Sequence, residues 1–155
     1  MFNGCRRLRY LNETDKFVTS TCTSMYCMFN ECNSLPFIDC GGWNTSNVTR
    51  MDSLFSQCYN LYKADVSNWD VSKVTILSYM FNNCYKLKKI NMSNWTVTLP
   101  TNYQQMFQNC TAVEELDVSG FTTTNVTNMY YTFYGCESLK ELDVSHFNTA
   151  NVTTF

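Results

Sequence analysis

The feature that most constrains this chain is a 26-residue period that runs through nearly all of its 155 residues. Three columns of large or sulfur-bearing side chains keep the same phase. The cysteine column is Cys5, Cys32, Cys58, Cys84, Cys110 and Cys136, with a step of 27 between its first two members because the first copy carries one inserted residue. The aromatic columns are Phe29, Phe55, Phe81, Phe107 and Phe133, and Trp43, Trp69, Trp95, Phe121 and Phe147. Columns that agree in phase indicate one structural unit that is stacked repeatedly.

The period divides the chain into six copies, and the length suits a single domain. The copies span approximately residues 1–24, 25–50, 51–76, 77–102, 103–128 and 129–155. One copy has too little chain to bury its own apolar residues, so neighbouring copies must cover one another. We therefore predict one repeat domain over residues 1–155.

The first part of each copy has the apolar spacing of a short helix. Met51, Leu54, Phe55 and Cys58 follow the i, i+3, i+4, i+7 pattern of one helical face. The same spacing recurs in residues 25–32, 77–84 and 103–110. A helix of about two turns is unstable alone, so it would have to pack on its neighbours.

The second part of each copy predicts a half-buried strand. In the last copy Leu142 and Val144 would point inward, while Asp143 and Ser145 would point outward. The third part is rich in Thr, Ser and Asn, which favour turns. Stacked strands would form a parallel sheet on one face and the short helices would cover the other. The predicted fold is an α/β repeat solenoid of about six coils, similar to leucine-rich-repeat proteins.

Most copies follow the pattern M-F-x-x-C-x-x-L-x-x-L-D-V-S-x-W/F-x-T-S-x-V-T-x-M, which is clearest in residues 51–76 and 129–155. This pattern resembles the BspA-type leucine-rich repeats, and most closely the longer variant of mycoplasma surface lipoproteins and bacterial cell-surface proteins. The first copy departs from it at residues 18–22, and the fourth at Leu99 and Pro100. The resemblance implies a surface adhesin that binds a host or matrix protein such as fibronectin, but it identifies no ligand.

Residues with catalytic or metal-binding potential form no recognisable motif. The single histidine, His146, lies in the outward position after Ser145, and no G-x-S-x-G, H-E-x-x-H or phosphate-binding glycine loop occurs. Nine cysteines cannot all pair, and the phase of the cysteine column predicts a ladder of buried thiols. Cys22, Cys27 and Cys40 have neither a C-x-x-C pair nor a nearby histidine. We expect no enzyme activity, no cofactor and no metal.

A column of acidic and amide residues follows the predicted strands. Its members are Asp39, Asp65, Asn91, Asp117 and Asp143. They would either accept hydrogen bonds from turn amides or hold a cation such as calcium. A hard cation needs about six or more oxygen ligands, more than one column supplies, so the structural role is favoured.

The charge of the chain is uneven along its length. Residues 1–90 carry ten Lys and Arg against seven acids, a formal charge of +3, and residues 91–155 carry one Lys against six acids, a formal charge of −5. The total of −2 gives no bias toward nucleic acid or anionic lipid. The uneven distribution either reflects drift at the surface or orients a partner.

We expect an extracellular or cell-surface location. No apolar run reaches the length of a membrane span, and Met1–Cys5 does not begin a signal peptide, so any export signal would lie outside this sequence.

The outward strand positions vary between copies while the core columns hold. They form one strip, made up of Arg9-Tyr10, Pro36-Phe37, Tyr62-Lys63, Lys88-Lys89, Glu114-Glu115 and Lys140-Glu141. The residues in this strip that we expect to bind a protein partner are Arg9, Tyr10, Phe37, Tyr62, Lys63, Lys88 and Lys89. Aromatic side chains and arginine are frequent anchors at protein interfaces. The predicted function is non-enzymatic adhesion to a host or matrix protein. The alternative is a structural protein that self-associates head to tail, because the two ends are nearly in phase and lack capping segments.

Overall fold

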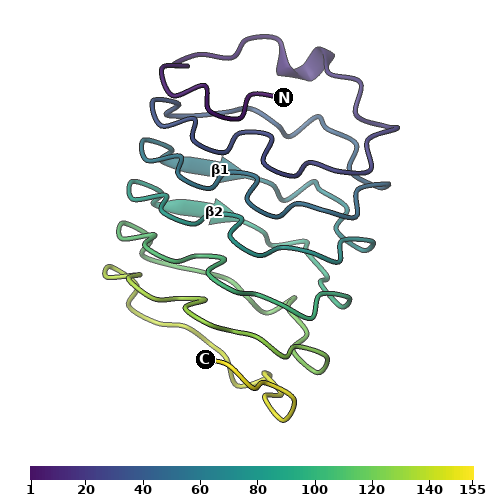
Figure 1. Cartoon of the computed structure of the whole chain (residues 1–155), viewed down its shortest axis with the longest axis vertical. Coiled ribbons are helices and arrows are strands. Elements are labelled where there is room, and N and C mark those ends of the chain that lie inside the picture. Colours follow the sequence, from purple (N-terminus) through teal and green to yellow (C-terminus); the bar gives the residue numbers. More distant parts are fainter.

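The structure is a computed structural model that describes residues 1–155. Successive copies of the repeat lie above one another as a stack of irregular coils, with the two termini toward opposite ends (Figure 1). Regular elements are few: the 3-10 helix η1 (Thr14–Lys16) and the strands β1 (Lys63–Asp65) and β2 (Lys89–Asn91). The two strands pair in parallel, with Lys63 opposite Lys89.

The predicted fold class, an α/β solenoid with short helices on one face, is wrong. The structure contains no α-helix, and β1 and β2 are its only regular strands. The strand expected around Leu142 and Val144 is not formed, and Val144 is exposed. Residues 51–58, which were expected to be helical, instead form overlapping four-residue turns. Leu54 N–H donates to the Met51 carbonyl at 3.2 Å and Cys58 N–H donates to the Phe55 carbonyl at 3.1 Å, three residues back.

Alternate amide groups explain why these turn segments (residues 25–32, 51–58, 77–84 and 103–110) are not helices. Every second N–H, Leu77 excepted, leaves its own segment and donates to the carbonyl 25 residues further along the chain, on the adjacent coil. In the third copy these donor–acceptor pairs, 2.7–3.0 Å apart, are Met51–Ile76, Ser53–Ser78, Phe55–Met80 and Gln57–Asn82. An α-helix would use these donors inside its own segment and leave the neighbouring carbonyls without partners. The stacking of copies therefore selects the turn conformation.

Two residues of each turn segment adopt left-handed backbone conformations. In the fourth copy these are Tyr79, with φ 63°, and Asn83, with φ 58°. A positive φ at the third residue of a four-residue turn is typical of type II turns. The segment still turns Leu77, Met80 and Phe81 inward, and all three are fully buried. The spacing of a helical face is thus kept without a helix.

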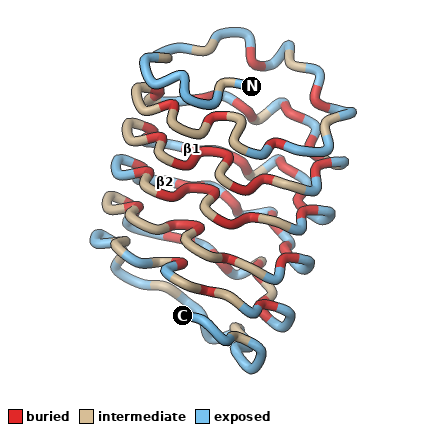
Figure 2. The backbone as a smooth tube through the Cα atoms, in the orientation of Figure 1, coloured by how far each residue is buried: buried red, intermediate tan, exposed pale blue.

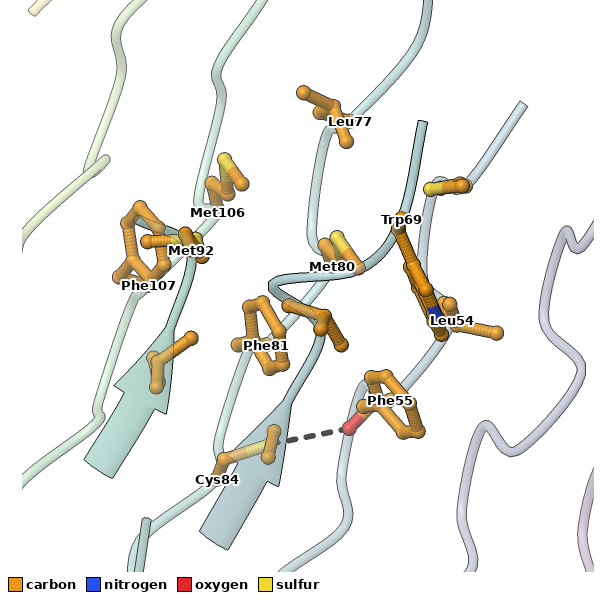
Figure 3. Packing of buried hydrophobic residues seen from close by; sticks show 14 of the residues in the cluster. Leu54, Phe55, Trp69, Leu77, Met80, Phe81, Cys84, Met92, Met106 and Phe107 are labelled. Carbon is orange, nitrogen blue, oxygen red and sulfur yellow. Dashed lines mark hydrogen bonds between the residues drawn. The ribbon is translucent and has the colours of Figure 1, made fainter. Parts of the chain in front are cut away.

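The core is one continuous cluster that follows the stack from Met25 to Met129 (Figure 2). Its centre is the phenylalanine column, in which Phe81 stacks between Phe55 and Phe107 with ring centroids 5.5 and 5.9 Å apart (Figure 3). The indole N–H of each tryptophan donates to a carbonyl of the preceding copy, as from Trp69 to Cys40 at 3.0 Å. No buried side-chain nitrogen or oxygen lacks a partner. The core is therefore apolar, and the polar side-chain atoms buried in it all have hydrogen-bond partners. It holds the outer side chains in fixed rows.

Candidate protein-binding surface

The candidate surface lies on the side of the stack that carries β1 and β2. Lys63 and Asp65 are exposed on β1, and Ala64 between them is buried. In β2 Ile90 is buried between exposed Lys89 and Asn91. This alternation anchors each strand in the core and leaves its outward side chains free to contact a partner.

Four of the residues predicted to bind a partner lie together on adjacent coils. Lys63 is opposite Lys89 in the parallel pair, and Lys88 N–H donates to the Tyr62 carbonyl at 3.0 Å. Phe37 extends this row, because it forms a parallel bridge to Lys63. The structure therefore brings these side chains into one patch.

Arg9 and Tyr10 lie in the first copy, outside the bridged part of this row. Both are exposed, but no backbone hydrogen bond joins either residue to the second copy. They are therefore less firmly positioned than Tyr62 and the three lysines.

The same side of the stack continues into an acidic region, whose residues the sequence placed on the outward strip but not among those expected to bind a partner. A shallow depression of about 590 Å³ spans β1, β2 and the following coil. Its charged lining residues are Lys63, Asp65, Lys88, Lys89, Glu114, Glu115 and Asp117. The signal for this region was the formal charge of −5 over residues 91–155. We call this depression and the outward side chains that border it, from Phe37 to Glu141, the binding face.

Most charges on the binding face have no ionic partner. Lys140 and Glu114 form its one ion pair, at 3.4 Å between exposed side chains. The other ion pairs of the molecule lie elsewhere, and none involves Lys63, Lys88 or Lys89. Like charges directly opposite one another destabilise a sheet. Lys63 and Lys89 therefore do not contribute to folding as a pair, which leaves them free for recognition.

The column of acidic and amide residues closes turns. The Asp65 carboxylate accepts hydrogen bonds from the Ser67 hydroxyl at 2.8 Å and from its amide at 3.3 Å. These hydrogen bonds, assisted by nearby Lys63, lower the pKa of Asp65. Asp117 and Asp143 accept the amides of Ser119 and Ser145 in the same way. No group of three or more His, Cys, Asp or Glu side chains is arranged to hold a metal ion.

Four members of the cysteine column are the last residues of the turn segments. Cys32, Cys58, Cys84 and Cys110 are fully buried, whereas Cys136 is half-buried and Cys5 is exposed. Each buried thiol donates to the carbonyl of a phenylalanine in the preceding copy, as from Cys84 to Phe55 at 3.1 Å (Figure 3). Burial raises the pKa of the Cys32 thiol to about 11. A buried thiol that resists ionisation is a poor nucleophile.

The remaining candidates for chemistry are dispersed. Cys40 is buried, and desolvation raises its pKa to about 12. Cys22 and Cys27 are half-buried. Exposed His146 places Nε2 3.1 Å from the carbonyl oxygen of Val118. These groups form no nucleophile and base pair within hydrogen-bonding reach.

Comparison with known proteins places the chain in a family. A family model described as "Mycoplasma protein of unknown function, DUF285" matches residues 1–116 and 92–155, which together span the whole chain. The chain belongs to the DUF285 family. No curated protein and no solved structure matches it. Membership in DUF285 supports the mycoplasma side of the resemblance seen in the repeat, but not a BspA-type assignment specifically.

DUF285 membership assigns no activity, as the family description says. The structure of this DUF285 chain has no helix of sufficient length and hydrophobicity to cross a membrane.

Proposed function

We propose that this DUF285-family protein is a non-enzymatic module of the cell surface that binds a host or extracellular-matrix protein through the binding face. The observation that carries the proposal is one row of exposed aromatic and unpaired cationic side chains. The row consists of Phe37, Tyr62, Lys63, Lys88 and Lys89. The BspA-type character of the repeat and the extracellular location belong to the same proposal and rest on the resemblance of the repeat.

The aromatic residues supply anchors for a partner. Phe37 is 44% exposed and Tyr62 is 51% exposed, on neighbouring coils. Large aromatic side chains that become buried at an interface commonly dominate its binding energy. The lysines beside them would orient the partner and speed its association.

The backbone under this row is preorganised. Tyr62 N–H donates to the Pro36 carbonyl at 3.0 Å, and Lys88 N–H donates to the Tyr62 carbonyl at 3.0 Å. Ala64 and Ile90 fix the same coils in the core. A surface that is already ordered loses less conformational entropy on binding.

The proposal is tested with immobilised fibronectin, collagen and laminin in biolayer interferometry. We expect the protein to bind at least one of them, and the variant Y62A/K63A/K88A/K89A to bind it at least about tenfold more weakly. The matched control is R7A/K73A/Y85A/K86A, which removes one exposed tyrosine and three exposed cations away from the binding face. Absence of binding to all three matrix proteins contradicts the proposed partner. Equal weakening in both variants contradicts the proposed face.

Head-to-tail self-association stays a prediction from the sequence. Sedimentation at high protein concentration would reveal concentration-dependent oligomers if it is right and a sharp monomer if it is wrong.

A further inference from the structure

The binding face changes sign along the axis of the stack. Its half nearer the N-terminus carries Lys63, Lys88 and Lys89, and the next coil carries Glu114 and Glu115. Both groups line the same depression of about 590 Å³, so the two signs border one concave surface. A neighbouring depression of about 430 Å³ carries the acidic half onward to Glu141. Its one cation, Lys140, is paired with Glu114 and is outnumbered by the carboxylates of the lining.

The two halves do not neutralise each other. No ion pair joins Lys63, Lys88 or Lys89 to the glutamates of the following coil. In the lining of the basic half the one carboxylate, Asp65, keeps its charge while it accepts hydrogen bonds from Ser67, but three lysines outnumber it. The face therefore presents an electrical dipole to solvent, with its positive end toward the N-terminus of the stack.

We propose that the binding face receives an extended peptide segment of the partner in which a block of acidic side chains adjoins a block of basic ones. The segment lies along the stack axis, with its acidic block over Lys63 and Lys89 and its basic block over Glu115 and Glu141. This inference rests on the proposed function and deepens it by specifying the charge pattern of the partner.

The dimensions of the stack set the length of each block. Neighbouring strands are about 4.8 Å apart, so the centres of the two halves, roughly two coils apart, are separated by about 10 Å. Three residues of extended peptide cover about the same distance, at roughly 3.3 Å each. Three acidic residues next to three basic residues therefore place one block over each half.

The charge pattern also argues against a uniformly charged partner. A polyanion such as a nucleic acid would be attracted by the lysines and repelled by Glu114 and Glu115. An alternating acidic and basic peptide would set both signs over each half, so attraction and repulsion would largely cancel. A block arrangement is the pattern that both halves favour.

The experiment uses two fluorescent, end-capped hexapeptides of identical composition. One has three glutamates followed by three lysines, and the other alternates glutamate and lysine. In fluorescence anisotropy at low ionic strength we expect the block peptide to bind the protein roughly fivefold more tightly, the ratio typical of about one exposed ion pair. The preference should shrink as the Debye length falls from about 30 Å at 0.01 M salt to about 8 Å at 0.15 M.

Charge-reversal variants of four exposed residues test whether the preference for the block peptide depends on the dipole of the binding face. K63E/K89E makes the face largely acidic, with Lys88 as the remaining cation of the former basic half, and E115K/E141K makes it largely basic, so each should lose the preference for the block peptide. The fourfold variant K63E/K89E/E115K/E141K has the original net charge and a reversed dipole. It should regain the preference, because the peptide can bind in the opposite direction.

Several outcomes would overturn the inference. These are equal binding of the two peptides, an unchanged preference in K63E/K89E, or tighter binding of a hexaglutamate peptide or a single-stranded oligonucleotide than of the block peptide. The result is separate from that of the proposed function. Matrix binding that depends on Tyr62 without a block preference would leave the proposed function intact. A preference for the block peptide without matrix binding would support the inferred charge pattern and contradict the proposed matrix partner.

Discussion

The turn segment of residues 51–58 and the strand β1 belong to the same copy but differ in how much of their side-chain surface is buried in the core. The turn segment places Met51, Leu54, Phe55 and Cys58 in the core, all fully buried. The strand commits only Ala64 to the core and turns Lys63 and Asp65 outward. Both segments hydrogen-bond to the next copy, so the stack is continuous on both sides. The difference indicates that stability comes mainly from the turn side, whereas most side chains of the strand stay outside the core.

Thiol labelling tests the burial of the turn side and has the largest expected effect. Desolvation raises the thiol pKa of Cys58, Cys84 and Cys110, and reaction would require opening of the core. With iodoacetamide at pH 8, we expect these thiols to react at least about a thousandfold more slowly than exposed Cys5, as a stably folded core implies. Peptide mass spectrometry over time gives each rate. Fast labelling of Cys84 in the native state would refute a closed core.

Truncation of a core aromatic residue on the turn side should destabilise the protein far more than truncation of an exposed residue on the strand side. Phe81→Ala removes a buried ring between two stacked rings and should lower the free energy of unfolding by about 3–5 kcal/mol. Lys89→Ala on β2 should change it by less than about 0.5 kcal/mol. Urea denaturation measures both values. Comparable losses in the two variants would break the proposed division between the sides.

Two substitutions of Ser53 distinguish a turn from a helix, because the two conformations predict opposite orders of destabilisation by valine and by glycine. Ser53 has φ 55°, where a β-branched side chain is strained and glycine is not. We expect Ser53→Val to destabilise the protein by about 1–3 kcal/mol and Ser53→Gly to be close to neutral. A helix would show the reverse order, because glycine costs more than valine there. Thermal or urea unfolding of both variants decides between these conformations.

The smallest expected effect is the pH dependence of the aspartate turns on the strand side. Hydrogen bonds from Ser67, Ser119 and their equivalent lower the pKa of Asp65, Asp117 and Asp143 below the ordinary value of 3.8. Carboxylates of this kind add stability above pH 4, and this stability is lost as the pH falls through the lowered folded pKa. The variant D65N/D117N/D143N keeps an acceptor, as Asn91 does for Ser93. Its stability should fall less between pH 5 and pH 2, and an unchanged slope would exclude the aspartates as its cause.

The binding face was only partly predictable from the sequence. The outward positions of Tyr62 and Lys63 follow from the alternation of the strand pattern, so their grouping with Lys88 and Lys89 was expected. The acidic half occupies the same outward strand positions, so the sequence also placed Glu114, Glu115 and Glu141 on this strip, although not among the residues expected to bind. Only the stacked structure shows that Glu114 and Glu115 line the same depression as the lysines.

The sequence by itself determined which side chains of the middle copies are internal, because the 26-residue columns of Phe, Trp and Cys specify what one copy must bury against the next. At the two ends of the stack no further copy covers Cys5 or Val144, and both are exposed. Only the tertiary structure decided where the backbone amides of the turn segments donate. Hydrophobic spacing constrains the direction of side chains, but the same N–H of Phe55 is satisfied equally by a carbonyl of its own helix or by Met80 of the next copy. The presence of that neighbour, with an unpaired carbonyl at the right height, selected the turns over the helix.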